Sequence, residues 1–214
     1  FGNVWLALYG GGLGVVSHIA PFFSFFPSDN MLPDRLATVS NVLVGENRTI
    51  RLATEGSGLV EMNAEGRLLR QITKKNGGAD DFLLTAFKDQ HQHVWLGLRK
   101  GGIAVQYAGS SVWKTIDLGE PVTEVRAIYE DHLGQIWFAA HQGVFIYDEG
   151  KGHVQKLLIN KPMLGDYAPR TLMEDGQHNM WVGTYGQGLY VYDPQHKLLR
   201  KMDKGNGCLL YTSD

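Results

Sequence analysis

Hydrophobic and polar residues alternate along this chain in short runs, with turns rich in Gly, Asp and Asn between them. One stretch shows the pattern clearly, with runs at residues 125–131, 135–140, 144–148 and 153–159 separated by HLG, HQG and EGKG. An alternation with a period of two, bounded by turn residues, is typical of β-strands. We therefore predict four antiparallel strands of five to seven residues here, with an Asx-type turn at Asp131.

The same pattern recurs along the chain. Aligned on one aromatic position, the repeats are spaced by 46, 44, 42 and 44 residues, with anchors at Trp5, Arg51, Trp95, Trp137 and Trp181. Six residues before the last four anchors stand Gly45, Asp89, Asp131 and Asp175. This period is that of a four-stranded propeller blade, and one blade cannot bury both faces alone. The sequence thus predicts an all-β fold, a β-propeller fragment of about five blades, with the repeated Trp filling the gaps between blades.

A family resemblance rests on two segments, EDHLGQIWFAAHQGVFIYD and EDGQHNMWVGTYGQGLYVYD. Their pattern of Asp, Gly, Trp and a Tyr-Asp end resembles the two-component regulator propeller repeat. KDQHQHVWLGLRKGGIAVQY matches more loosely, and the second copy departs from the family by placing Arg51 where Trp is usual. The resemblance implies the extracytoplasmic sensor region of a bacterial hybrid histidine kinase of Bacteroidetes type, in which propellers usually have seven blades. It also implies a periplasmic location, anchored through the inner membrane.

The two ends of the chain bear on its organisation. The first copy lacks an opening strand, and the last seven residues, CLLYTSD, break the repeat register. These seven read as the translation of a sequencing-library adapter, although a native strand of a sixth blade is the alternative. We expect a partial propeller at residues 1–207 and an adapter artefact at 208–214, which would make this a truncated metagenomic fragment. The single cysteine, Cys208, then lies outside the native part, as suits an exported protein.

Composition excludes several functions. The net charge is −2 and basic residues form no stripe, so we expect no nucleic-acid partner. The chain shows no Gly-x-Ser-x-Gly elbow, no His-Glu-x-x-His motif and no phosphate-binding Gly-x-x-x-x-Gly-Lys. His91 and His93 form a His-x-His pair without a third ligand, so exposed turn histidines are the favoured interpretation, and we predict neither metal nor cofactor.

An enzyme remains an alternative because some sialidases are propellers with an Asp-Gly-Trp hairpin motif. Their Gly follows Asp by two positions, whereas Asp131 and Gly134 are three apart. Glu130 and Glu174 occupy equivalent repeat positions, which favours a structural role over one differentiated pair of catalytic carboxylates. We therefore predict no catalysis in this chain.

Candidate binding residues come from the loops, where repeat proteins place recognition. The position four after each anchor is large and variable, and holds Tyr9, Glu55, Arg99, His141 and Tyr185. Arg126 and Arg170 precede their anchors by eleven residues, where they would line a channel mouth or form a repeated salt bridge. Loops at 27–34, 76–81 and 161–169 add further candidates, among them Asp166 and Tyr167 for a sugar. The run at 22–26, FFSFF, matches a fourth strand.

Two functions are consistent with these features. The first is a non-catalytic ligand-sensing propeller that responds to polysaccharide fragments, so an oligosaccharide is its expected ligand. Through the family resemblance, its other partners would be a neighbouring propeller or immunoglobulin-like domain of the same chain and, at full length, a second copy in a homodimer. The alternative is an interaction scaffold that binds no small ligand.

Overall fold

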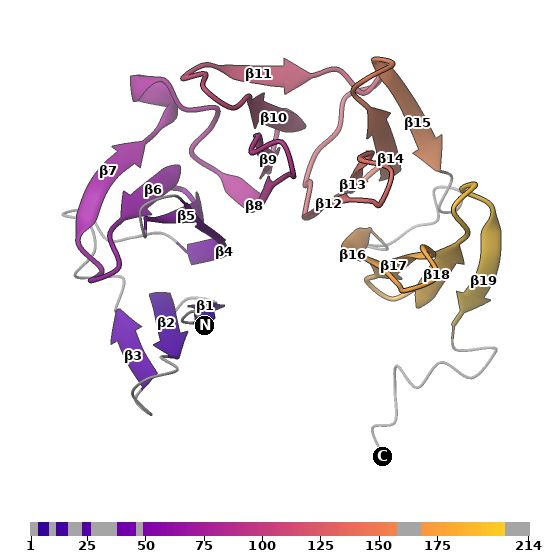
Figure 1. Cartoon of the computed structure of the whole chain (residues 1–214), viewed down its shortest axis with the longest axis horizontal. Coiled ribbons are helices and arrows are strands. Elements are labelled where there is room, and N and C mark those ends of the chain that lie inside the picture. Colours follow the sequence, from indigo (N-terminus) through magenta and orange to yellow (C-terminus); the bar gives the residue numbers. More distant parts are fainter. Residues whose placement is uncertain are drawn as a thin grey trace. The chain divides into compact units, whose positions relative to one another are not determined.

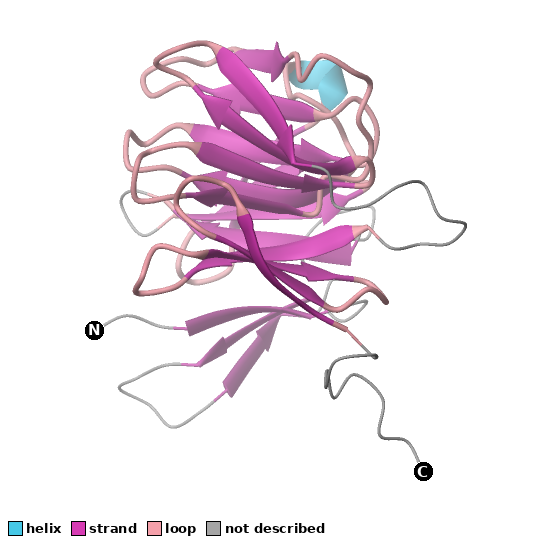
Figure 2. Ribbon diagram, turned by 90° about the vertical axis from the view of Figure 1, so that its right-hand side faces the viewer, coloured by secondary structure: helices cyan, strands magenta, loops and turns pink. Residues whose placement is uncertain are grey.

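The computed structural model describes residues 4–8, 12–16, 23–26, 38–45, 49–157 and 168–203, and before residue 38 only the backbone strands are described. Contacts divide the chain into two compact units, residues 1–116 and 117–214, which are described separately. The predicted artefact at 208–214 lies outside the described residues. Figure 2 shows that strands dominate the fold. Among the described residues, no helix is long and apolar enough to cross a membrane.

The first unit contains three antiparallel sheets (Figure 1). The first sheet has three strands, in the order β1 (Val4–Leu8), β2 (Gly12–Val16) and β3 (Phe23–Phe26). The second is β4 (Thr38–Val44), β5 (Ile50–Glu55), β6 (Leu59–Met62) and β7 (Leu68–Ile72). The third is β8 (Leu83–Lys88), β9 (Val94–Leu98), β10 (Ile103–Gln106) and β11 (Trp113–Ile116). A 3-10 helix, Lys74–Asn76, lies between the second and third sheets.

The second unit contains two four-stranded sheets with strands in sequence order. They are β12 (Ala127–Glu130), β13 (Ile136–Ala140), β14 (Gly143–Asp148) and β15 (His153–Leu157), then β16 (Pro169–Glu174), β17 (Met180–Thr184), β18 (Leu189–Tyr192) and β19 (Leu198–Met202). Across both units the predicted blades are confirmed, at about five with the first one three-stranded. Within the FFSFF run, Phe23–Phe26 form the outer strand β3, paired with β2.

The repeated Trp and Asp are joined by a hydrogen bond. The indole Nε1 donates to the carboxylate six residues earlier at 2.7 Å for Trp95 and Asp89, and at 2.8 Å for Trp137 and Asp131. The other oxygen of Asp131 accepts backbone amides of the following turn at 2.9 Å, as the predicted Asx turn requires. One carboxylate therefore ties a turn to the middle of the next strand.

In the second sheet, both members of the Asp–Trp pair are replaced. Gly45 stands in place of the Asp and Arg51 in place of the Trp. The second sheet therefore lacks both the carboxylate acceptor and the indole donor of this hydrogen bond. Instead, Arg51 Nε lies 2.7 Å from Glu61, its cross-strand neighbour in the β5–β6 register. A cross-strand ion pair has replaced the buried indole.

Within each unit, neighbouring blades pack against each other through apolar side chains. Trp137 is 2% exposed and belongs to one apolar cluster with Val182, Tyr190 and Tyr192 of the next blade. This confirms that a repeated Trp fills the space between two blades. In the first unit, Ser40 Oγ also donates to Leu83 O at 2.7 Å, which links the second and third sheets. Because each sheet covers its neighbour, residues about one repeat apart are brought into contact.

Candidate functional site

The variable position four after each anchor is held in the same way in three blades. It follows or ends the second strand, and its backbone amide donates to a carbonyl that precedes or opens the same blade. These bonds are all 3.0 Å long and join Arg99 to Phe82, His141 to Thr123 and Tyr185 to Ala168. Glu55 instead ends β5 and pairs with Thr38 in the ladder. The repeat thus fixes the backbone at this position while its side chain varies.

In the first unit, two of these predicted residues meet. Arg99 forms an ion pair with Glu55 of the preceding blade, and the two side chains are 40% and 20% exposed. The Nε atom of Arg99 is buried and has no hydrogen-bond partner within the described part of the chain. A buried donor without a partner costs roughly 1–3 kcal/mol.

A pocket of about 670 Å³ opens beside Arg99. Its charged and aromatic walls come from the segment before β8 and the turn after β9, and include Lys74, Asp80, Asp81, Phe82, Arg99 and Lys100. Phe82 is 48% exposed, so its ring presents an apolar face to solvent. The volume lies within the range of about 300–1,000 Å³ that holds a small ligand. One wall belongs to the loop at 76–81 that the sequence singled out.

The pocket wall is ordered by its own polar contacts. Asp81 accepts the Lys74 amide at 2.8 Å, and its carbonyl accepts the amides of Gly56 and Gly58 at 2.8 and 2.9 Å. Lys74 Nζ lies 3.7 Å from Asp80. The 3-10 helix and the segment after it are therefore tied to the β5–β6 turn. Both carboxylates and cations line the pocket, so it presents hydrogen-bond donors and acceptors together.

In the second unit, three predicted residues converge on a fourth that sequence reasoning missed. Arg126 donates to Glu124 Oε2 through Nε at 3.2 Å and Nη2 at 2.8 Å, and Arg170 Nη1 lies 3.9 Å from the same oxygen. The Arg170 guanidinium lies 5.7 Å from the centroid of the Tyr185 ring, a cation–π arrangement. Tyr185 is 62% exposed. Arg126 pairs with Glu124 within its own blade, whereas Arg170 approaches Glu124 from the next blade, and a place for the two arginines at a channel mouth stays a prediction.

The backbone conformation of Glu124 is unusual and could not be predicted from the sequence. Its φ is +50°, in the left-handed region where a residue with a side chain is uncommon. Arg170 is the extra residue of a bulge between β16 and β17, since the ladder register shifts between Pro169 and Thr171. Both deviations aim side chains from the start of a blade toward the same place. Neither can be read from a pattern of residue types.

Other candidates are not brought together. His141 is exposed in the β13–β14 turn and, among the described contacts, does not join the ion pairs of Glu124. Tyr9, Asp166 and Tyr167 lie outside the described residues, so their roles stay predictions. His91 is exposed, and His93 Nδ1 accepts the Ala108 amide at 3.1 Å. That bond occupies one imidazole nitrogen, as fits turn histidines.

Comparison with solved structures identifies the fold. The extracellular domain assigned to a hybrid two-component system of B. thetaiotaomicron has a TM-score of 0.75 at 17% identity, over 96% of this chain and 27% of that one. A domain assigned to a one-component system of the same organism gives 0.72 at 18% identity, over 97% and 27%. This chain therefore spans about a quarter of the length of those structures.

A catalytically inactive virginiamycin B lyase from Staphylococcus aureus, in complex with quinupristin, has the same fold. Its TM-score is 0.73 at 13% identity, over 94% of this chain and 66% of that one. Identities this low show a shared β-propeller fold and leave function to the site itself. No curated protein sequence matches the chain.

One segment of the chain matches the sequence model of a known family. Residues 163–186 match the sequence model of the two-component regulator propeller. The matched segment includes Asp175 and Trp181, the hydrogen-bonded pair of the last blade. Residues 163–186 are thus similar to the propeller repeat of two-component regulators.

Proposed function

We propose that this chain is a ligand-sensing propeller from the extracytoplasmic sensor region of a two-component regulator, and that it binds an oligosaccharide in the pocket beside Arg99. The pocket itself is the observation that carries the proposal. Its lining combines an exposed aromatic ring with cations and carboxylates, and it includes Arg99 at the variable repeat position. Sugars present apolar ring faces, which can stack on an aromatic ring, and many hydroxyl groups, which can bond to charged side chains.

Binding is favoured over catalysis by the way the charges are paired. Glu55 is held by Arg99, and Asp80 by Lys74. A pair of catalytic carboxylates would need distinct environments, one that stabilises the protonated form and one that stabilises the ionised form. The two described carboxylates that line the pocket are instead both engaged by Lys74, Asp80 by its ammonium group and Asp81 by its backbone amide. We infer that the site recognises its ligand without cleaving it.

Signalling would follow from a difference in affinity between two arrangements of the sensor. A ligand shifts such an equilibrium only by as much as it favours one state. The pocket is lined by the segment between the second and third blades and by the turn after β9, and its Arg99 forms an ion pair with Glu55 of the second blade. A ligand that contacts Arg99 would therefore act on an ion pair that joins the two blades.

The test is a screen of defined oligosaccharides by calorimetry on the whole chain, followed by three variants. Phe82→Ala should weaken the best ligand about five- to tenfold, since an aromatic contact contributes about 1–1.4 kcal/mol. Leu199→Ala is the matched control, because Leu199 is 56% exposed on β19, outside the pocket. Tyr185→Ala tests the Glu124 cluster as the alternative site. Unchanged affinity in Phe82→Ala, with a loss in Tyr185→Ala, would contradict this placement.

A further inference from the structure

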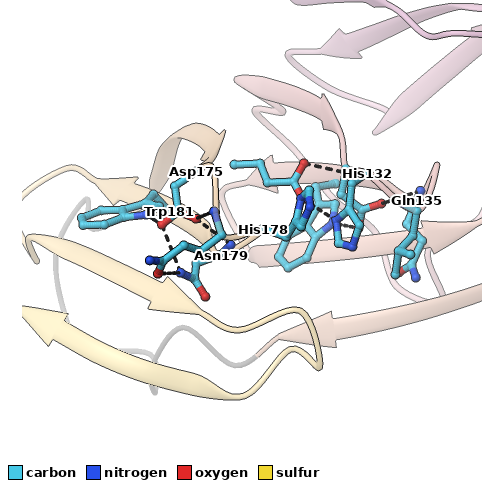
Figure 3. A network of polar contacts seen from close by, with 11 residues as sticks. His132, Gln135, Asp175, His178, Asn179 and Trp181 are labelled. Carbon is cyan, nitrogen blue, oxygen red and sulfur yellow. Dashed lines mark hydrogen bonds and ion pairs between the residues drawn. The ribbon is translucent and has the colours of Figure 1, made fainter.

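Three potential metal ligands meet on turns that the sequence places far apart. His132 lies in the β12–β13 turn, Glu174 ends β16, and His178 lies in the β16–β17 turn of the next blade. One ligand atom from each of the three side chains lies within 4.8 Å of the others. Figure 3 shows His132 and His178 next to each other. Their rings are stacked, with centroids 3.9 Å apart and planes inclined by 24°.

Glu174 is the centre of the group. Its Oε1 contacts the Nδ1 atoms of both imidazoles, at 3.1 Å for His178, and its Oε2 accepts the His132 amide at 3.0 Å. The Glu174 side chain is 10% exposed, whereas those of His132 and His178 are 27% and 53% exposed. A largely buried carboxylate thus faces two imidazole rings that solvent can reach. A small hollow of about 10 Å³ beside them is the size of one water molecule or ion.

Both turns are held rigid by the repeated Asp. Asp131 accepts the amides of Leu133 and Gln135 at 2.9 Å, and Asp175 accepts those of Gln177 and Asn179 at the same distance. Each Asp is also tied to its Trp. The two histidines are therefore carried on pre-organised turns, as a precise ligand set requires.

We propose that His132, Glu174 and His178 form a binding site for Zn²⁺ or a similar divalent transition metal that clamps two neighbouring blades. Two imidazoles and one carboxylate are a donor set that Zn²⁺ takes with water in the fourth position. When ligand atoms lie 2.0–2.2 Å from a tetrahedral metal ion, they are about 3.3–3.5 Å from each other. Small shifts of the three side chains would therefore bring their ligand atoms into this arrangement.

One substitution removes a ligand without harm to the turn. His178 has a φ of +64°, where Gly is favoured over a residue with a side chain. His178→Gly therefore deletes a ligand while it relieves the backbone. Gln92 has a φ of +65° at the equivalent turn position of the third blade, so Gln92→Gly makes the same backbone change. Gln92 also lies between His91 and His93, so this control reports on that pair as well.

The experiment is a calorimetric titration of the metal-free whole chain with Zn²⁺ at pH 7.5, with thermal unfolding as a second readout. We expect one Zn²⁺ per chain and a higher unfolding temperature with metal, since a ligand of the folded state stabilises it. His178→Gly should weaken binding by more than about 100-fold, because loss of a residue that merely orients a ligand already costs up to about that much. Glu174→Gln should weaken it strongly, while Gln92→Gly should bind like the parent chain.

Two results would overturn the site. The first is absence of saturable binding by the parent chain. The second is a titration that His178→Gly leaves unchanged, or that Gln92→Gly abolishes, because the metal would then bind elsewhere. The proposal does not depend on the oligosaccharide pocket, since these side chains and those of the pocket belong to different units. Failure of one would leave the other standing.

Discussion

The hydrogen bond between Trp137 and Asp131 should contribute measurably to the stability of the second unit. The Trp137 side chain is 2% exposed and Asp131 is 8% exposed, and the carboxylate accepts the indole at 2.8 Å and two backbone amides at 2.9 Å. Bonds to a charged group contribute about 1.5–3 kcal/mol, and an unpaired buried group costs a similar amount. The perturbation should therefore separate the indole bond from the two amide bonds.

Asp131→Asn makes this separation. The Asn oxygen can still accept the backbone amides, but its NH₂ then faces the indole N–H, so two donors meet. Trp137→Phe removes the indole donor. In a double-mutant cycle by urea unfolding, we expect a coupling free energy of about 1.5–3 kcal/mol between the two positions. Coupling below about 0.5 kcal/mol would refute the view that this bond, rather than the bulk of Trp, holds the turn to the strand.

Two further predictions concern the last blade. Gly188→Ala should destabilise the protein by about 3 kcal/mol or more in urea unfolding, because φ is +81° and a Cβ would collide with the Met202 carbonyl oxygen. Gly176→Ala is the control, with nothing within 4 Å of its Cβ, and equal losses in both would contradict the reasoning. Hydrogen bonds from the Trp181 indole and neighbouring amides lower the pKa of Asp175 to about 2. Because this folded-state pKa lies below the unfolded value, the ionised Asp175 stabilises the fold above pH ~4, and this contribution is lost as pH falls toward 2. Asp175→Asn should therefore reduce the loss of stability in acid. An Asp175 carboxyl that titrates near pH 4 by NMR would contradict this prediction.

Much of the fold could be predicted because the repeat is strict in sequence. The run predicted at 144–148 is β14, which begins one residue earlier at Gly143, and the run at 125–131 shortens to Ala127–Glu130. Arg126 still donates its amide to the Ala139 carbonyl at 2.8 Å, one residue before β12 begins. The 3-10 helix at Lys74–Asn76 was not predicted, since three residues carry no period.

The site was harder to predict because its contacts join residues about one repeat apart. Glu55 and Arg99 are separated by 44 positions, and His132 and Glu174 by 42. The period indicates which turns become neighbours, but which side chains touch depends on rotamers and on a bulge such as that at Arg170. Sequence reasoning therefore named Glu55 and Arg99 without pairing them. It treated the position of Glu174 as structural and did not connect it with His132.

The most direct test of the sensor assignment is amide hydrogen exchange of the whole chain with and without oligosaccharides that saturate it. If the pocket beside Arg99 is the site, protection should rise at residues 79–82 and 98–101, which line it. Exchange around Tyr185 should change little. Saturation without added protection in either segment would contradict the central claim, as would protection confined to the turn that holds Tyr185.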